Sequence, residues 1–348
     1  MAIKILSDIV TVVSEHIANP STPEYDIFVG LEHYDAGEPV ITRYGSTAQL
    51  ESSVKHFNEG DILVARRNVY LKRAGVVKFE GVTSGDSIVL RVKDERYKAI
   101  IPFLLNTEEF WDYAEQNSDG TMSKRLAPDV LLEYECDIPD NHKEIADKLW
   151  AAYELKEAYK KMIAATDEMV KTQFNEMFGA DTPKQKISEV CDVRGGSTPS
   201  RTNSLFWDNG DVPWFTVDDI YSQGKYIRET KQHITKLATK KCFVYPIDTV
   251  VICCTASIGE CALAKIEMAS NQQFNGMMIK DRNKLDPQFL LYVSSTLKEE
   301  LLRQAGKTTI HFVSRNKLEE MQIPVPSMDK QQRFVAIMEQ ADKSKYFS

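Results

Sequence analysis

Hydrophobic and polar positions follow the same order twice along this chain. In ECDIPDNHKEIADKL, residues 135–149, an apolar strand pattern passes through a proline into a helical pattern. In EMQIPVPSMDKQQRFVAIM, residues 320–338, the same change recurs, with Ile323–Pro324 lying 185 positions after Ile138–Pro139. Proline lacks a backbone donor and disfavours helix in the residue before it. Each stretch therefore predicts a short strand that ends where a helix begins.

Further pairs of segments keep a similar offset. The matching pairs are ILSDIV (5–10) with KISEVC (186–191), EGDILVARR (59–67) with PIDTVVICC (246–254), and TSGDSIVLRV (83–92) with ASNQQFNGMMI (269–279). Similarities in one order indicate an internal duplication. The strand segments are rich in β-branched residues and bounded by turn residues, and helical patterns follow them. The predicted fold class is α/β (α+β), with two globular domains in tandem pseudo-repeat.

A long helix is expected between the two repeats. Residues 141–179 contain no proline, and their only glycine is the last residue. An apolar stripe at helical spacing runs through Ile145, Leu149, Ala152, Tyr159, Ile163, Val170 and Met177. A stripe of this kind requires a cover. We expect an antiparallel partner in the C-terminal helix, whose apolar positions include Phe334, Ile337 and Met338.

The predicted organisation follows from these elements. It consists of a first globular domain (1–140), a central helix (141–180), a second globular domain (181–327) and a C-terminal helix (328–348).

Composition and charge leave the class of partner open. The net charge is −8, but residues 1–140 carry 14 basic and 24 acidic groups whereas residues 185–327 carry 18 and 16. Acid-free basic runs occur at 66–78 and 231–241. Such runs are often solvated faces, yet local patches bind phosphate even on acidic proteins. The six cysteines lack metal-type spacing, and no apolar run suits a secretory signal or a membrane helix. Free, mostly buried thiols in a cytoplasmic protein are expected.

Motifs of the second repeat resemble a known family. These are RGGSTPS (194–200), DVPWFTVDDI (211–220), TASIG (255–259), ASNQQF (269–274), LDPQFLLY (285–292), GKTTIHFVSRNKL (306–318) and IPVPSMDKQQRFV (323–335). In this order they resemble the DNA specificity (S) subunit of type I restriction–modification systems. The resemblance covers essentially the whole chain. It implies two target-recognition domains, each followed by a helical spacer, of which the last is shorter than usual here, or truncated.

The resemblance also implies a function and its partners. The family's subunit is not catalytic; it binds double-stranded DNA at a bipartite, asymmetric site and directs adenine methylation and restriction by other chains. Two methyltransferase (M) subunits are its implied partners, joined by restriction (R) subunits in the full complex. S-adenosylmethionine is expected on the M subunit and no cofactor or metal on this chain. The implied setting is the cytoplasm of a bacterium or archaeon, on DNA and away from membranes.

The candidate DNA-binding residues are cations, hydroxyls and amides in loops. Cations and hydroxyls suit phosphate oxygens, and the amides of Asn and Gln can pair with adenine edges. In the first repeat the candidates are Arg66, Arg67, Asn68, Tyr70, Lys72, Arg73, Thr121, Ser123, Lys124 and Arg125. In the second they are Arg194, Ser197, Thr198, Ser200, Thr255, Ser257, Asn271, Gln272, Gln273, Asn275, Lys307, Thr308, Thr309, Ser314 and Arg315, with His311 equally suited to a structural role. Polar loops that bond to themselves are the alternative in each case.

Enzyme motifs are missing from the sequence. It contains no Walker phosphate loop, GxGxxG, GxSxG, HExxH or [DN]PP[YF] stretch. A specificity subunit is therefore the preferred interpretation, and a stand-alone DNA-binding regulator with the same fold is the alternative.

Overall fold

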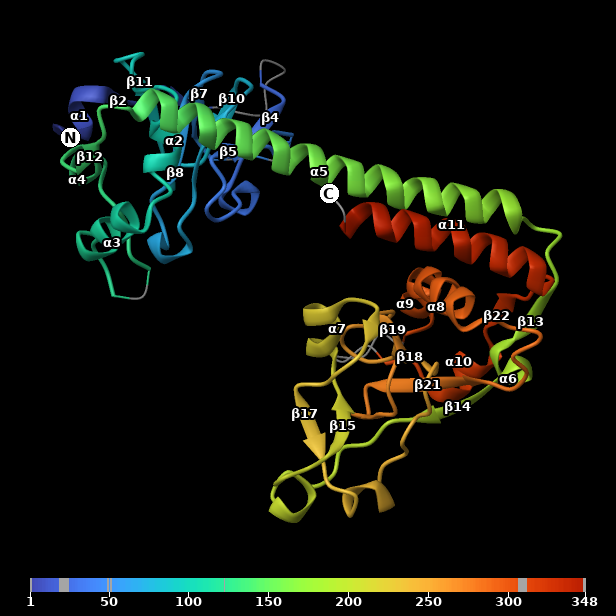
Figure 1. Ribbon diagram of the computed structural model, residues 1–348. Coiled ribbons are helices and arrows are strands. Elements are labelled where there is room, and N and C mark those ends of the chain that lie inside the picture. The colour runs from blue at the N-terminus through green and yellow to red at the C-terminus, as the bar shows by residue number, and fades with distance from the viewer. Residues whose placement is uncertain are drawn as a thin grey trace. The chain divides into compact units, whose positions relative to one another are not determined.

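The protein is described by a computed structural model over residues 2–18, 25–48, 50, 52–121, 123–305 and 312–346. It divides into two compact units, unit 1 (Met1–Ala158) and unit 2 (Tyr159–Ser348). Both units mix helices and strands (Figure 1). The α/β (α+β) prediction is confirmed.

Unit 1 ends with the strand and the helix that the proline change predicted. Its elements are β1 (Ala2–Ile5), α1 (Leu6–Ile9), β2 (Val10–Val13), β3 (His16–Ile17), β4 (Ile27–Val29), η1 (Leu31–His33), β5 (Val40–Ile41), β6 (Gly45–Ser46), β7 (Val54–Phe57), β8 (Ile62–Ala65), η2 (Val69–Leu71), β9 (Ala74–Val77), β10 (Gly81–Thr83), β11 (Ser87–Val92), α2 (Ile101–Leu104), α3 (Glu108–Gln116), α4 (Pro128–Leu132), β12 (Glu135–Ile138) and the first part of α5 (His142–Met177).

Unit 2 contains the rest of α5 and the second repeat. Its elements are β13 (Lys184–Lys186), α6 (Ile187–Val190), β14 (Cys191–Gly195), η3 (Ser204–Phe206), β15 (Val212–Phe215), α7 (Val217–Gln223), β16 (Tyr226–Ile227), β17 (Gln232–Ile234), η4 (Ala238–Lys240), β18 (Val250–Cys253), β19 (Cys261–Ala264), β20 (Ala269–Ser270), β21 (Phe274–Ile279), α8 (Pro287–Thr296), α9 (Lys298–Gln304), α10 (Arg315–Glu320), β22 (Gln322–Pro324) and α11 (Met328–Tyr346).

The main sheets of the two units have the same strand order. Unit 1 has β2-β11-β8-β9-β5 and unit 2 has β14-β21-β18-β19-β16. In both, the last pair is parallel and the other pairs are antiparallel. The outer strand pair repeats as well, because β1 pairs antiparallel with β12 as β13 does with β22. The prediction of an internal duplication is confirmed.

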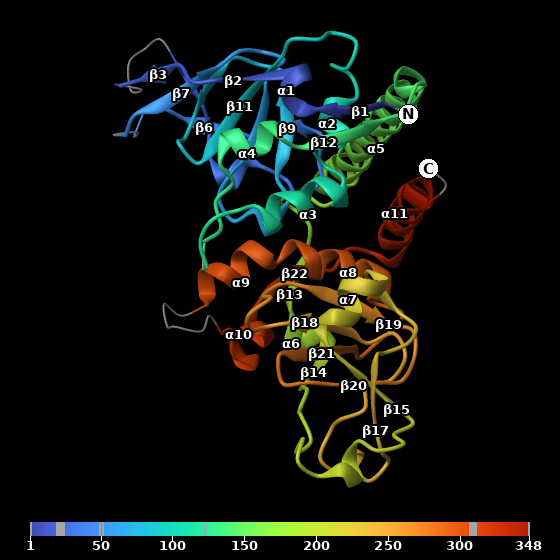
Figure 2. The ribbon, with the colours of Figure 1, turned by 90° about the vertical axis from the view of Figure 1, so that its left-hand side faces the viewer.

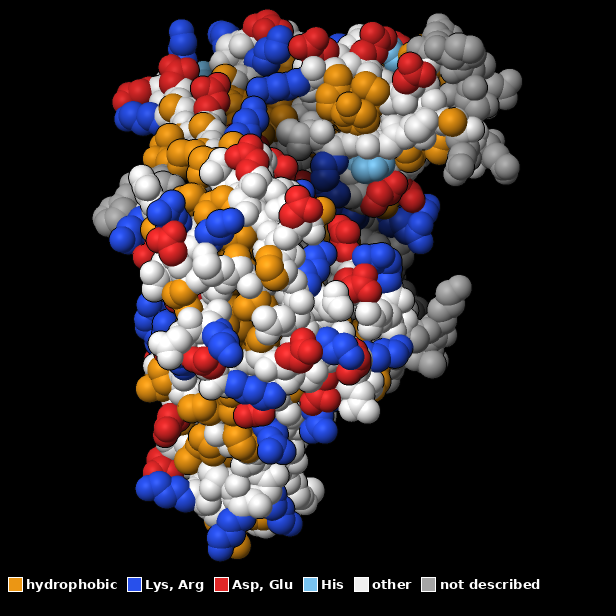
Figure 3. Space-filling model, turned by 90° about the vertical axis from the view of Figure 1, so that its right-hand side faces the viewer, with side chains coloured by type: hydrophobic (Ala, Val, Ile, Leu, Met, Phe, Trp, Pro, Cys, Tyr) orange, Lys and Arg blue, Asp and Glu red, His pale blue; other side chains and the backbone are white. Residues whose placement is uncertain are grey.

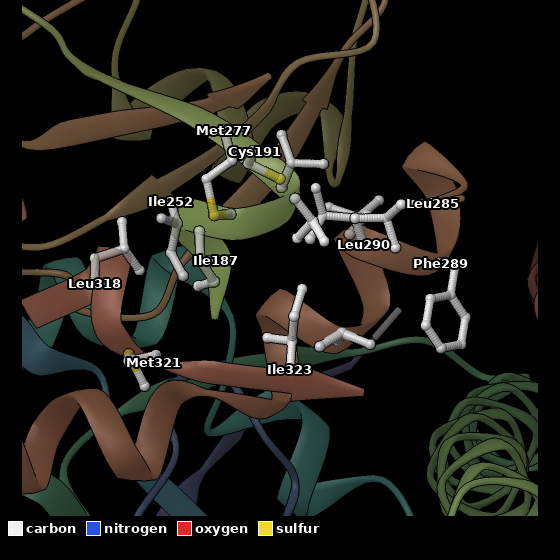
Figure 4. Packing of buried hydrophobic residues seen from close by; sticks show 14 of the residues in the cluster. Ile187, Cys191, Ile252, Met277, Leu285, Phe289, Leu290, Leu318, Met321 and Ile323 are labelled. Carbon is white, nitrogen blue, oxygen red and sulfur yellow. The ribbon is translucent and has the colours of Figure 1, made fainter. Parts of the chain in front are cut away.

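The central strands of both main sheets are buried on both faces. In β8, Ile62 and Val64 enter the core under the helices, while Leu63 and Ala65 enter a second core on the other face. In β18, alternate residues separate in the same way into two cores. Continuous runs of β-branched and apolar residues are typical of strands covered on both sides. Figure 4 shows the helix-side core of unit 2 around Ile252 and Met277.

A second sheet covers the other face of each main sheet, and here the units differ. Unit 1 has five strands in the order β3-β7-β10-β4-β6, whereas unit 2 has three in the order β17-β15-β20. One parallel pair is common to both: Phe28 lies opposite Val82 in unit 1, and Trp214 lies opposite Ala269 in unit 2. We call the three-stranded sheet of unit 2, with residues 196–211 and 235–242, the distal lobe. Strands β15 and β17 stand away from the main sheet in Figures 1 and 2.

Helix α5 has 36 residues, or roughly 54 Å of helix. Within unit 1, Trp150 holds it: the indole Nε1 donates to the Ala99 carbonyl at 2.8 Å, and the ring packs on Phe103 at 4.9 Å between centroids. Within unit 2, Phe174 and Phe178 lie 5.3 and 5.7 Å from the ring of Phe334 in α11. The antiparallel pairing of α11 with the second part of α5 is visible in Figure 1 and confirms the prediction.

The cysteine thiols are free and five of the six are buried, as predicted. Burial raises the pKa of Cys254 to about 11 and the pKa values of Cys191 and Cys261 to about 12. These thiols are therefore protonated at neutral pH. Among the described residues, no helix is both long and apolar enough to cross a membrane.

Candidate nucleic-acid interface

The two predicted DNA-binding segments of unit 1 lie side by side. Backbone hydrogen bonds join them: the Asn68 N–H donates to the Lys124 carbonyl at 2.9 Å, and the Leu126 N–H donates to the Arg66 carbonyl at 2.8 Å. Residues 56 and 60 positions apart in sequence are thereby placed on one surface. A role of these residues in DNA binding remains a prediction. The fold brings the two segments together, as a single binding surface requires.

Side chains link the same two segments. Arg67 Nε donates to Ser123 Oγ at 3.0 Å, and that hydroxyl donates to Asn68 Oδ1 at 3.1 Å. Asn68 and Lys72 flank η2 with φ of +55° and +50°, a left-handed conformation that Asn tolerates better than most residues. The turn between them presents Tyr70, which is 56% exposed, and Thr121 is exposed on the neighbouring loop.

Acidic side chains pair with several cations of unit 1. Asp86 lies between two guanidinium groups, at 3.4 Å from Arg67 Nη1 and 3.3 Å from Arg125 Nη2. Lys72 is paired with Glu108, a hydrogen bond that raises the pKa of the lysine. Such pairs fix the cations in place and reduce the net charge they offer to phosphate.

Three further cations of unit 1 differ in their burial and in their hydrogen bonds to the backbone. Lys124 Nζ donates to the Glu115 carbonyl at 2.9 Å. Arg73 donates to the Leu31 carbonyl at 2.9 Å, and its burial lowers its pKa, so it serves the fold rather than an open groove. Arg66 is half-buried; burial and the nearby Arg66 charge together lower the pKa of Lys55. Arg66 and Lys55 form a local concentration of positive charge.

In unit 2, the segment 194–200 lies against the segment 270–273. The Ser197 N–H donates to the Ser270 carbonyl at 2.9 Å. A Cβ on Gly196 would lie 2.1 Å from the Asn271 carbonyl oxygen and 2.2 Å from Ser270 Oγ, so only glycine permits this approach. The absence of a side chain at Gly196 thus allows the backbone of this segment to approach that of residues 270 and 271.

The polar side chains of these segments divide between internal bonds and solvent. Thr198 Oγ1 donates to Gln272 Oε1, and both side chains are exposed. Asn271 and Gln273 bond to one another, with Nδ2 to Oε1 at 2.9 Å, which is the self-bonded polar loop that the sequence left open. Asn275 is only 7% exposed, so the expectation that its amide faces a base needs correction.

The hydroxyls of the same segment also have partners. Ser197 Oγ donates to the Lys241 carbonyl at 2.9 Å, and Ser200 Oγ lies 2.9 Å from Thr202 Oγ1. The Arg194 side chain is exposed on β14, while its carbonyl accepts from the Tyr245 hydroxyl at 3.0 Å. These residues can still meet phosphate, since their bonds lie at the surface.

Among the remaining candidates of unit 2, Ser314 and Arg315 lie at the start of α10. Thr255 forms an isolated bridge with Phe312, and Ser257 Oγ lies 3.3 Å from the Tyr221 hydroxyl. Ser314 is the N-cap of α10, and its Oγ accepts from the Lys317 N–H. Arg315, which was expected in a loop, begins that helix and pairs with Glu319 at 3.3 Å. Lys307, Thr308, Thr309 and His311 lie outside the described residues.

The structure adds a group that the sequence prediction missed. In the distal lobe, the Arg201 guanidinium carbon lies 3.7 Å from the Trp207 ring centroid and 4.7 Å from that of Trp214. The arginine follows the RGGSTPS motif directly, which was the available signal. The positions of Trp207 and Trp214 in the sequence do not predict that Arg201 packs against both rings.

The predicted apolar stripe of α5 and α11 is covered only in part. Val170, Phe334 and Met338 are buried, while Ile145, Tyr159, Met177 and Ile337 are half-buried. Leu149, Ala152 and Ile163 are exposed, as are the neighbouring Leu155, Met162 and Met169. Within its own unit, each part of α5 therefore retains apolar surface open to solvent.

Comparison with known proteins identifies the second repeat. Residues 181–346 match the family described as type I restriction modification DNA specificity domain. The EcoprrI type I restriction enzyme specificity subunit of Escherichia coli is 31% identical over 163 residues, which are 46% of this chain and 41% of the relative. The MjaIX specificity subunit of Methanocaldococcus jannaschii is 32% identical over 178 residues, 49% of this chain and 41% of the relative. The matched region thus spans less than half the length of each relative.

A solved structure extends the likeness in fold to nearly the whole chain. The S subunit of a type I restriction–modification system from M. genitalium superposes with a TM-score of 0.62 and 13% identity, covering 99% of this chain and 90% of that chain. This likeness shows a shared fold with both repeats and the long helix. Over residues 181–346, the chain is therefore similar to type I restriction–modification specificity subunits.

Proposed function

We propose that this chain is the DNA specificity subunit of a type I restriction–modification complex. It binds double-stranded DNA at a bipartite, asymmetric site, and each unit recognises one half. The duplicated main sheet carries the proposal, because two copies of one framework with different loops suit two different half-sites. Surface cations near loop hydroxyls and amides in both units support contact with phosphates and base edges.

Catalysis belongs to partner subunits in this proposal. Two methyltransferase subunits bind S-adenosylmethionine and methylate adenine, and restriction subunits join them in the full complex. The exposed apolar residues of α5 support a docking surface for these partners. In unit 1, Leu149 and Leu155 lie on the same helix as Trp150, which lines a hollow of about 480 Å³ together with Val76 and Pro102. A hollow lined by both apolar and charged residues, beside an apolar helix face, suits an inserted partner side chain.

The spacing of the half-sites is assigned to α5 in the same proposal. The helix lacks internal glycine and proline, so we infer that it is stiff and fixes the number of unspecified base pairs. A four-residue insertion after Thr166 adds about one turn, close to 6 Å. The expected result is a gap longer by one or two base pairs with both half-sites unchanged.

The proposal is tested by sequencing methylated DNA. The chain is produced together with a methyltransferase subunit in cells, and adenine methylation is mapped with and without the chain. We expect methylation at one bipartite sequence only when the chain is present. Exchange of residues 1–140 for those of a relative should alter one half of that sequence. Methyl transfer by the isolated chain, or methylation that does not depend on it, contradicts the proposal.

A further inference from the structure

Arg201 occupies a corner between two indole rings of the distal lobe. Its guanidinium carbon is 3.7 Å from the Trp207 centroid and 4.7 Å from the Trp214 centroid, and the two rings meet at 85° with centroids 5.0 Å apart. At 3.7 Å the guanidinium is in van der Waals contact with the indole, where cation–π attraction holds it. Long arginine side chains at surfaces usually sample many rotamers, and this contact limits that freedom.

The same two indoles position the chain segment that carries Arg201. Trp207 Nε1 donates to the Ser200 carbonyl at 3.0 Å, and Trp214 Nε1 donates to the Ser197 carbonyl at 3.3 Å. Trp214 is only 2% exposed and lies in β15, so the platform belongs to the core of the lobe. Both the backbone before Arg201 and its guanidinium are therefore fixed by one rigid support.

The donors of Arg201 are not used within the part of the chain that the structure describes. No ion pair or hydrogen bond joins its guanidinium to another described residue, and the side chain is exposed. Elsewhere arginines have acidic partners, for example Arg67 with Asp86 and Arg315 with Glu319. Asp211, an acid of the distal lobe, instead lies 3.5 Å from Lys236. A guanidinium held by its face keeps the N–H groups of its edge available for a ligand.

The surroundings of Arg201 are basic and suit DNA. Lys241 Nζ lies 5.7 Å from the Phe206 ring, and the Lys241 carbonyl accepts from Ser197 Oγ, so this cation belongs to the same lobe. Lys240 lies beside it in η4. At the lower end of Figure 3, where the distal lobe lies, blue Lys and Arg side chains outnumber red acidic ones.

We propose that Arg201 is a specificity-determining residue that reads a guanine in the half-site of unit 2. The planar guanidinium, fixed against Trp207, donates two hydrogen bonds to O6 and N7 of guanine in the major groove. A contact to phosphate needs only a charge nearby, whereas a bidentate base contact needs a fixed plane, and the two indoles supply that orientation. This inference rests on the proposed function, because it names a residue that reads the DNA sequence.

The test compares lysine substitutions at two exposed arginines of unit 2. Arg201→Lys keeps the charge and the cation–π contact but loses the paired, planar donors. Arg228→Lys is the control, because Arg228 is also exposed and has no aromatic stack among the described residues. The full chain, in its complex with the methyltransferase subunit, selects duplexes from a pool with randomised positions, and bound sequences are counted at several salt concentrations.

We expect Arg201→Lys to reduce the preference for guanine at one position by on the order of 10- to 100-fold. The other positions and the dependence of affinity on salt should stay unchanged, and Arg228→Lys should select as the wild type does. Thermal melts check that the fold is retained. If the lysine variant melts below the assay temperature, Arg201→Gln, which retains the side-chain stem on Trp207 without the paired donors, gives the same readout.

Two results overturn the assignment and are distinguishable from failure of the proposed function. If Arg201→Lys selects the same bases with wild-type preference, Arg201 does not read a base. If Arg201→Gln weakens binding equally for all sequences and lowers the salt slope by about one unit, the residue contacts phosphate. If the wild-type complex enriches no sequence at all, the proposed function fails and the assignment of Arg201 fails with it.

Discussion

In unit 1, the guanidinium groups of Arg67 and Arg125 face Asp86, whereas in unit 2 the guanidinium of Arg201 faces Trp207. The main sheets beneath these groups have the same strand order and the same pattern of parallel and antiparallel pairs. The two units therefore orient surface cations in different ways on one framework. An acidic partner reduces the charge that a cation offers to DNA, while an aromatic partner leaves that charge intact.

The main sheets are alike and the second sheets differ, and the packing of their strands accounts for this. In both units, alternate residues of the central strand enter two separate cores, so a shift by one residue would exchange the cores. The second sheets differ in size, with five strands in unit 1 and three in unit 2. Variation in the second sheet and its loops changes the surface that we propose meets DNA, while the strand order of the main sheet stays the same.

The largest expected effect tests how unit 2 holds α5. Phe334 is fully buried, and its ring centroid lies 4.7 Å from Tyr292 and 5.3 Å from Phe174. Phe334→Ala should lower the free energy of unfolding of unit 2 by roughly 3–5 kcal/mol, because it leaves a cavity among these rings. Urea unfolding followed by tryptophan fluorescence measures it. Phe243→Ala, at a ring 40% exposed, is the control; equal losses in both variants would contradict the packing described for α11.

The second prediction concerns the close approach of backbones in unit 2. Gly196→Ala places a Cβ 2.1 Å from the Asn271 carbonyl oxygen, so the loop must move and stability should fall by roughly 1–3 kcal/mol. Gly195→Ala is a matched control, because its Cβ would lie 3.5 Å from Asn275 Oδ1, an ordinary contact. Thermal melts of both variants measure the difference. If the two alanines cost the same, Gly196 is not required for the approach.

The third prediction concerns the attachment of α5 within unit 1, which depends on fewer rings than the attachment in unit 2. Trp150→Phe keeps an aromatic ring against Phe103 but removes the donor to the Ala99 carbonyl. The cost should be about 1 kcal/mol, the usual net value of one hydrogen bond. Hydrogen exchange over residues 142–156 should accelerate, while exchange in β18 of unit 2 should stay the same. Unchanged exchange in α5 would show that the indole N–H does not hold the helix.

Sequence patterns predicted the elements that have a long periodic run of apolar residues or a proline at their boundary. The central helix and the proline change before α11 were predictable because each depends on residues close in sequence, and the duplication was predictable because similar segments recur in the same order. The second sheet of unit 2 was not, since β17 and β20 have only three and two residues, too few to show an alternation. The loop segments that carry the candidate residues were predictable, but the ion pairs between their side chains were not. Asp86 lies about 20 residues from Arg67 and 39 from Arg125, and no local pattern links them.

The smallest expected effect tests the pairing of cations in unit 1. Asp86→Asn removes the charge between Arg67 and Arg125 while keeping the shape of the side chain. Both guanidinium groups then become available to phosphate. The affinity for DNA of arbitrary sequence should rise several-fold at low salt, and the dependence of log affinity on log salt should steepen by about one unit.

The matched control is Asp94→Asn, which removes another arginine partner of unit 1. Asp94 accepts from Arg96 at 2.9 and 2.6 Å, and this pair, on the loop after β11, lies outside the predicted DNA-binding segments. Its loss should leave the salt dependence of DNA binding unchanged. Filter binding or fluorescence anisotropy with a labelled duplex at several salt concentrations separates the two variants. If Asp86→Asn leaves the slope as it is in the wild type, Arg67 and Arg125 do not face DNA. In that case the pairing of Arg67 and Arg125 with Asp86 would have no role in DNA binding, and the comparison with Arg201 would not concern how unit 1 binds DNA.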